Sequence, residues 1–299
     1  MKRYLLGLAL SVLTFTAVAE NLEMGLATGR QTGTYYQFGQ DISRLVAKDQ
    51  IQVNVLESQG SVDNLLALWD RRSVQLAISQ SDVLFFMAEL GDEKTRRLVD
   101  DFRVVMPLYL EEAHLLARED IKQLSDLEGK RVAIGEPGSG TAMSAEIFLK
   151  VSQIQPSAVA AVGGGKAIEA LKAGEIDALF YVAGSPVRLL QERVSADDGL
   201  HLVPVASEEL SKLYGPMVTI PAGTYAWQTE ALETIGIEAA LMTLAFAPEN
   251  AECASVRKVS QAIVDGLDWL KQKGHEKWGN VDLEREVAEG NRSACSAIY

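Results

Sequence analysis

A strand, a glycine-rich loop and a helix follow one another between residues 129 and 151, and this unit constrains the fold more than any other stretch. Arg131 to Ile134 is a short apolar run of strand type. Three glycines and a proline within 135–140 then interrupt regular structure. Ser139 or Thr141 caps the helix that follows. The free N–H groups and partial positive charge of such a helix start suit a carboxylate or a phosphate.

The loop by itself is equally compatible with an ordinary connection between a strand and a helix. It is not a P-loop, because no lysine follows Gly140. It is not the nucleophile elbow of a serine hydrolase, since Pro137 stands where the motif G-x-S-x-G has its first glycine.

The alternation of strand and helix patterns occurs twice along the chain. The first series has strand patterns at Leu22–Ala27, Ile51–Leu56 and Gln75–Ser79, each followed by a helix pattern. The second series begins at Arg131–Ile134 and ends with Ile176–Tyr181. This order predicts the α/β class, with two lobes that each carry a parallel or mixed sheet covered by helices.

Two extended apolar runs, Met106–Leu110 and Met217–Pro221, flank the second series. We interpret them as hinge strands on which the chain leaves lobe one and returns to it. Ligands of open α/β sheets bind at the carboxyl ends of the strands, so a cleft between the lobes is the expected binding site. The boundaries that follow are 20–107 with 222–299 for lobe one, and 108–221 for lobe two.

The first residues have the pattern of a signal peptide. Lys2 and Arg3 precede an apolar stretch that ends in Ala17-Val18-Ala19, which predicts residues 1–19 as the signal, cleavage after Ala19 and a periplasmic protein. No other stretch is long and apolar enough to cross a membrane, so we expect no membrane insertion. We also expect a monomer. Removal of Lys2 and Arg3 leaves 26 basic against 41 acidic residues, a net charge of −15, which excludes nucleic acid as a partner.

The segment from Thr224 to Tyr299 has a mostly helical pattern and is expected to complete lobe one. Its two cysteines, Cys253 and Cys295, predict a disulfide in an exported chain, although two buried free thiols are the alternative. No metal site is expected, because none of the three histidines has a ligand-like neighbour at helical spacing: His114, His201 and His275.

Polar residues in the loops that follow the strand patterns are the candidate ligand contacts. Tyrosine offers an apolar wall and a hydroxyl donor, and the amide of glutamine both donates and accepts. Each candidate also has a structural reading: ring packing for the tyrosines, and helix capping for Ser61 and Asp82. The candidates are Gly33, Thr34, Tyr35, Tyr36, Ser61, Asn64, Gln80, Asp82, Ser139, Gly140 and Thr141.

The ordered set of motifs resembles the TAXI family, the solute receptors of tripartite ATP-independent periplasmic (TRAP) transporters. Each motif alone is common, but the order is specific and covers essentially the whole mature chain. The motifs are Ala27-Thr28-Gly29, Gly33-Thr34-Tyr35-Tyr36-x-x-Gly39, Gly60-Ser61-Val62-x-Asn64-Leu65, Gln80-Ser81-Asp82, Gly138-Ser139-Gly140-Thr141 and Gly174-x-Ile176-Asp177-Ala178.

The resemblance implies a two-lobed periplasmic-binding-protein-like fold of type II with a hinged cleft. It implies binding of a small organic acid and delivery of that acid to an ion-gradient-driven TRAP permease, with no catalytic residue and no cofactor. The acid is a dicarboxylate, a 2-oxoacid such as 2-oxoglutarate, or an acidic amino acid. The chain departs from the family at Arg30-Gln31 and at the glycine run 163–165, which leaves open whether Arg30 or Lys166 contacts the ligand.

Two other functions fit the same fold. A periplasmic sensor would bind the ligand and report it to a signalling partner. An enzyme that resembles the thiamine-pyrimidine synthases would need a pyridoxal-lysine, histidines and a cysteine-rich stretch. The two late cysteines and scattered histidines of this chain argue against the enzyme, so we expect a binding protein.

Overall fold

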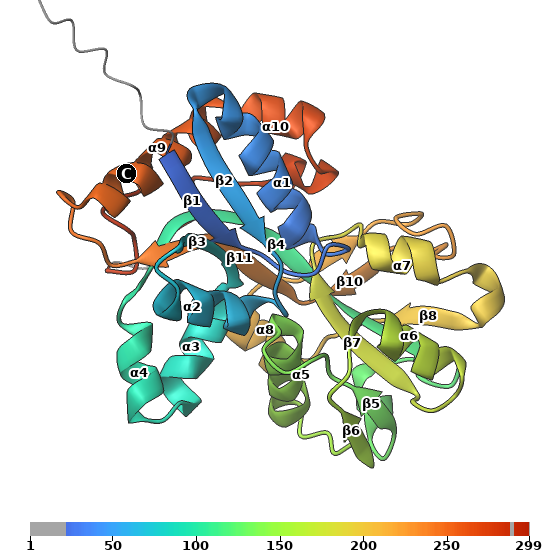
Figure 1. Cartoon of the computed structure of the whole chain (residues 1–299). Coiled ribbons are helices and arrows are strands. Elements are labelled where there is room, and N and C mark those ends of the chain that lie inside the picture. Colours follow the sequence, from blue (N-terminus) through green and yellow to red (C-terminus); the bar gives the residue numbers. More distant parts are fainter. Residues whose placement is uncertain (1–21, 288–289, 299) are drawn as a thin grey trace, which may run out of the picture.

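The computed structural model describes residues 22–287 and 290–298 and shows two α/β lobes that share one sheet. Lobe one takes up the left of Figure 1, and lobe two lies at the lower right. The predicted signal peptide, residues 1–19, lies outside the described residues. Within them, no helix is both long and apolar enough to span a membrane.

Lobe one begins with three parallel strands, which confirms the predicted first series. A helix follows each strand because the apolar positions change from alternating to helical spacing at each glycine or polar loop. The elements are β1 (Leu22–Ala27), α1 (Thr34–Val46), β2 (Ile51–Leu56), α2 (Ser61–Asp70), β3 (Val74–Gln80), α3 (Ser81–Leu90) and α4 (Glu93–Val99).

Lobe two repeats the arrangement with shorter strands. Its parallel strands are β5 (Arg131–Ala133), β6 (Ala158–Ala160) and β7 (Ala178–Ala183). The helices and remaining short strands are α5 (Gly140–Val151), α6 (Gly164–Lys172), α7 (Arg188–Arg193), β8 (Leu200–Val203), α8 (Glu208–Tyr214), β9 (Val218–Ile220) and β10 (Leu232–Thr234).

One long strand, β4 (Phe102–Arg118), belongs to both lobes. Its first part pairs with β11 (Gly236–Leu244), and its last part pairs with β7 and β8. The strand order is therefore β2-β1-β3-β11-β4-β7-β5-β6, with β8 alongside β4. The two expected sheets are two parts of one continuous sheet, because β4 runs through both.

The prediction for the return to lobe one was wrong. The run Met217–Pro221 contains β9, which pairs only with β10, and the chain returns on β11 instead. Ile220 and Tyr225 are buried in the core of lobe two, so lobe two extends beyond the predicted boundary at residue 221 to about residue 235.

The composition of β11 explains the error. Residues 236–244 are rich in alanine, leucine, methionine and glutamate, which favour helices, and the short apolar run did not distinguish helix from strand. Hydrogen bonding to β3 on one side and β4 on the other fixes the strand. Tertiary pairing here overrides local propensity.

Two helices follow β11, α9 (Ala251–Asp265) and α10 (Leu267–Lys273), and they pack on lobe one as predicted. Beyond them the chain is mostly irregular, so the helical prediction holds only for part of the segment. Trp278 anchors the irregular part, since its ring stacks on Phe38 of α1 with centroids 4.1 Å apart.

The predicted disulfide is present. Cys253 of α9 and Cys295 near the end of the chain form the bridge, and both are fully buried. It ties the irregular segment to the last long helix, as the cysteine positions predicted.

Replacement of both cysteines by alanine is expected to lower the free energy of unfolding by about 4 kcal/mol, because the bridge closes a loop whose ends are 42 residues apart. Urea denaturation of the oxidised wild type and the double variant measures the difference. Equal midpoints and slopes for the two proteins would contradict this role for the bridge.

Candidate functional site

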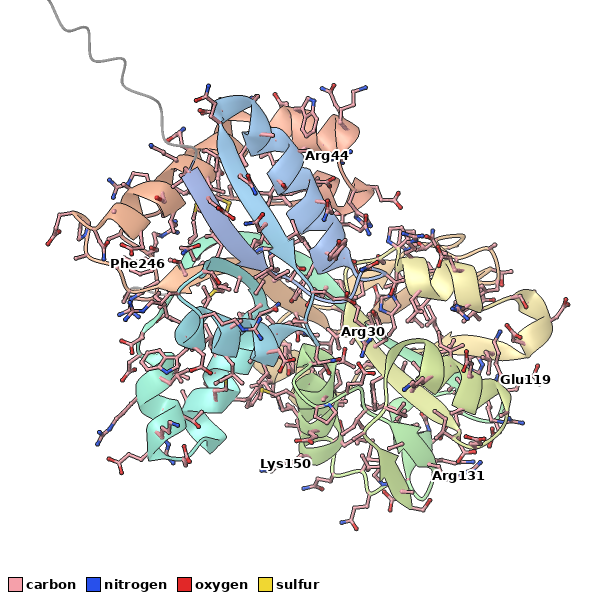
Figure 2. The ribbon with its side chains drawn as sticks, viewed as in Figure 1. Arg30, Arg44, Glu119, Arg131, Lys150 and Phe246 are labelled. Carbon is pink, nitrogen blue, oxygen red and sulfur yellow. A yellow bond between two sulfur atoms is a disulfide. The ribbon has the colours of Figure 1, made fainter. Side chains whose placement is uncertain are left out.

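A cleft lies where the two lobes face each other at the carboxyl ends of their parallel strands. The segments after β1 and β2 together with the end of β3 line one wall, and the segments after β5 and β6 together with β7 line the other. The cavity in the cleft is partly open and measures about 80 Å³, which suits a small molecule. Figure 2 shows Arg30 at this junction of the lobes.

The start of α5 forms part of the cleft wall, as the opening motif predicted. Ser139 is the N-cap: its hydroxyl accepts from the N–H of Ala142 at 3.1 Å and donates to the carbonyl of Glu136 at 2.7 Å. Gly140 and Thr141 line the cleft directly. The first turn therefore presents N–H groups and the positive end of a 12-residue helix to a ligand. The hydroxyl of Ser139 serves the cap.

Gly140 brings the two lobes into close contact. A Cβ at this position would lie 1.4 Å from Oε1 of Gln80 and 2.7 Å from Oγ of Ser61, both of which belong to lobe one. Gln80 and Ser61 are themselves buried, so a side chain at position 140 would have to displace both of them. The absence of a side chain at Gly140 is thus a requirement of the closed cleft.

Direct bonds between the lobes show that this is a closed state. Thr34 donates its hydroxyl to the carbonyl of Gly184 at 2.7 Å. The N–H of Asp63 donates to the carbonyl of Gly138 at 3.0 Å. At the mouth of the cleft, Nε of Arg30 donates to Oε2 of Glu136 at 2.8 Å.

Glu111 of β4 lines the floor of the cleft and is only 2% exposed. Its Oε2 accepts from the hydroxyl of Tyr35 at 2.9 Å. Burial raises the pKa of Glu111 well above its usual range, although the bond from Tyr35 opposes this. Tyr181 of β7 also lines the cleft, and burial raises its pKa to about 12, with a smaller contribution from Glu111.

The neighbouring carboxyl, Glu112, is also buried but has a cation. Nζ of the buried Lys277 forms an ion pair with Oε1 of Glu112, and the N–H of Ser185 donates to Oε2 at 2.7 Å. The pair holds the C-terminal segment against β4. Neither Glu112 nor Lys277 lines the cleft.

Eight of the eleven predicted site residues line the cleft. They are Gly33, Thr34, Tyr35, Ser61, Gln80, Ser139, Gly140 and Thr141.

Asn64, Tyr36 and Asp82 do not line it. Nδ2 of Asn64 donates to the carbonyls of Thr28 and Ile78, and its Oδ1 accepts from Ser58, so Asn64 holds the ends of β1 and β3 together. Its own hydrogen-bonding groups are thus used within lobe one, outside the cleft. Tyr36 is half-buried on α1, outside the cleft.

Asp82 lies in the first turn of α3 in lobe one and contacts lobe two outside the cleft. Its Oδ2 accepts from Ser144 of α5 at 2.8 Å and from Tyr214 of α8 at 3.0 Å. Oδ1 is buried without a partner among the described residues. Burial raises the pKa of Asp82 to about 6.

Sequence reasoning did not select several cleft residues, chiefly Glu111, Glu136 and Tyr181. Glu111 and Tyr181 lie within strands rather than in the glycine loops that gave the signal. Of the two basic residues left open, Arg30 lines the cleft, whereas Lys166 is exposed and outside it. The described residues contain no cluster of three or more metal-ligating side chains.

The sequence model of the NMT1-like family matches residues 26–292, which span both lobes. The chain belongs to the NMT1-like family. The match includes every described residue that lines the cleft.

Solved structures with the same architecture are distant in sequence. A protein from Bordetella bronchiseptica RB50 is 16% identical, with 90% of this chain and 86% of that chain covered and a TM-score of 0.54. An ancestral arginine-binding protein is 15% identical, with 86% and 97% covered and a TM-score of 0.54.

A histidine kinase sensor domain with similarity to periplasmic binding proteins is 13% identical, with 87% of this chain and 96% of that chain covered and a TM-score of 0.53. At these identities the likeness concerns the fold alone. The fold of this NMT1-like chain is the two-lobed type II fold of periplasmic binding proteins, as predicted.

The raised pKa of Asp82 predicts a pH dependence of stability. The folded state holds the proton of the Asp82 carboxyl more tightly than the unfolded state does. The contribution of Asp82 to the free energy of unfolding is therefore fully present below a pH of about 4 and is lost as pH rises through about 6. Asp82→Asn should remove this loss, worth about 3 kcal/mol by pH 7.

Urea denaturation between about pH 4 and pH 7 measures the effect as the difference between wild type and Asp82→Asn. Asp70→Asn is the matched control, because Asp70 is exposed on α2. If the curves of wild type and Asp82→Asn run parallel over this range, the assigned titration is wrong.

Proposed function

We propose that the protein is an exported solute receptor that captures a small organic acid in the cleft between its lobes. The ligand class is a dicarboxylate, a 2-oxoacid such as 2-oxoglutarate, or an acidic amino acid. The receptor then delivers the acid to the membrane subunits of an ion-gradient-driven TRAP transporter. In this role it acts in the periplasm as a monomer and carries out no chemistry.

The observation that carries the proposal is the start of α5, which faces the cavity between the lobes. A carboxylate placed there meets backbone N–H groups and the positive end of the helix. Loops from lobe one complete the wall, so a bound acid would contact both lobes and favour their closed arrangement.

The wider chain supports the same role. Neutral donors and a helix dipole attract an anion locally even though the mature chain has a net charge of −15 from 26 basic and 41 acidic residues. Membership of the NMT1-like family and the resemblance of the ordered motifs to TAXI receptors support a receptor of the TRAP type.

A sensor that reports the ligand to a signalling protein is the second candidate, favoured by the similarity of the fold to a histidine kinase sensor domain. Uptake of the ligand by vesicles that contain the partner permease distinguishes the two roles, since a sensor leaves uptake unchanged. An enzyme that resembles the thiamine-pyrimidine synthases would need lysine, histidine and cysteine in its site. Among the described residues none of these lines the cleft, which supports binding without chemistry.

A thermal-shift screen of the mature protein tests the ligand class with succinate, glutarate, 2-oxoglutarate, L-aspartate and L-glutamate. A true ligand at a hundred times its Kd adds about 2.7 kcal/mol to the free energy of unfolding. No stabilisation by any acid in the series would overturn the proposed ligand class.

Gly140→Val should abolish the shift, because a branched side chain at the start of α5 collides with Gln80 and Ser61 when the lobes close. Gly165→Val is the matched control in the same lobe, since a Cβ at Gly165 meets no atom within 4 Å. A full ligand-induced shift in Gly140→Val would show that binding does not need this closed arrangement.

A further inference from the structure

Glu111 is a carboxyl group in the cleft without a cation of its own. The other cleft carboxyl, Glu136, forms an ion pair with Arg30, and the neighbouring Glu112 forms one with Lys277. Within the described chain Glu111 forms no ion pair, and its one hydrogen bond is the bond that Tyr35 donates to Oε2. Oε1 therefore has no partner there.

The charges of the cleft lining do not suit a ligand that is only an anion. Arg30 is the sole basic side chain among the described cleft residues, and Glu136 already neutralises it. A dicarboxylate would bring two negative charges into a space whose one described cation is already paired with Glu136. A ligand with a positive group beside its carboxylate would match both the start of α5 and Glu111.

We propose that Glu111 is a specificity-determining residue that binds a protonated amine, so that the ligand carries an ammonium group together with its carboxylate. This inference rests on the proposed function and narrows it to amino acids and related amine-bearing acids. The carboxylate of the ligand lies at the first turn of α5, and its ammonium donates to Oε1 of Glu111. Tyr35 holds the other oxygen and fixes the orientation of the carboxyl group.

The surroundings of Glu111 make its protonation depend on the ligand. Burial raises the pKa of Glu111, the charges of Asp82 and Glu112 add to the effect, and the bond from Tyr35 and the charge of Lys277 oppose it. Tyr109 and Tyr181 also face it. An ammonium beside the carboxyl stabilises its ionised form. Binding of an amine ligand therefore favours release of a proton from Glu111.

Titration calorimetry with matched pairs of ligands tests the inference. Each pair contains an amino acid and the acid that lacks only the amine: L-glutamate with glutarate, L-aspartate with succinate, and L-alanine with propionate. For the amino acid that binds best, the wild type is expected to prefer the amine member roughly ten- to hundredfold, the usual strength of a hydrogen bond to a charged group.

Glu111→Gln should remove that preference by weakening the amine member roughly ten- to hundredfold, with little change for its partner. It should also abolish the proton release, which appears as a difference between binding enthalpies in phosphate and Tris buffers. Glu238→Gln is the matched control, because Glu238 lies on the adjacent strand β11, half-buried and outside the cleft. Should Glu111→Gln fail to fold, Tyr35→Phe should reduce the same preference while keeping the carboxyl group.

The outcomes separate this inference from the proposed function. Equal binding of the two members of a pair by the wild type, or an unchanged preference in Glu111→Gln, would overturn the role of Glu111. Neither result would contradict the proposed function as a receptor. Absence of binding by every member of every pair and by 2-oxoglutarate would overturn the proposed function and the inference with it.

Discussion

The pairing of β4 with β11 is the constraint on which the rest of the structure depends. These two strands carry the chain between the lobes, and their antiparallel ladder makes one sheet out of two. Pro107, which lacks the N–H that a ladder needs, pairs with Ala240 next to a shift in register. The ladder is thus irregular close to the point where the lobes separate. Backbone irregularity at such a crossing provides a place for hinge motion.

The same strand places two consecutive glutamates on opposite faces of the sheet. Glu112 turns away from the cleft and is neutralised by Lys277, so its burial fixes the C-terminal segment to the centre of the molecule. Glu111 turns into the cleft, and within the described residues its one hydrogen-bond partner is the hydroxyl of Tyr35. A buried carboxyl without a cation is expensive to ionise. On the proposal made above, the ammonium group of the ligand supplies the positive charge that lets Glu111 ionise.

The βα units were predictable from the sequence because their signals are local. Glycine loops, helix caps and the change in apolar spacing located the start of α5 and the loops of lobe one, and the cysteine count located the disulfide. The return of the chain to lobe one on β11 was not predictable in the same way. Residues 236–244 have helix-favouring composition, and only pairing with β3 and β4 makes them a strand.

The same difference between local and non-local signals separates the residues of the candidate site that were predicted from those that were not. Gly33, Thr34 and Gly140 belong to loop motifs and were found, whereas Glu111 and Tyr181 lie within strands and face the cleft only through the sheet's register. Asn64 and Asp82 belong to motifs as well, yet one fixes the loops of lobe one and the other joins the lobes behind the cleft. A helix-start motif alone does not tell which way its polar side chain points.

Small-angle scattering of the free and ligand-saturated protein tests most directly the claim that the lobes close on a ligand by bending at β4 and β11. The probe is the acid from the matched pairs that binds the wild type best, with saturation verified by calorimetry on the same sample. The account predicts a smaller radius of gyration in the saturated protein than in the free protein. An identical radius in both, with the ligand demonstrably bound, would contradict it.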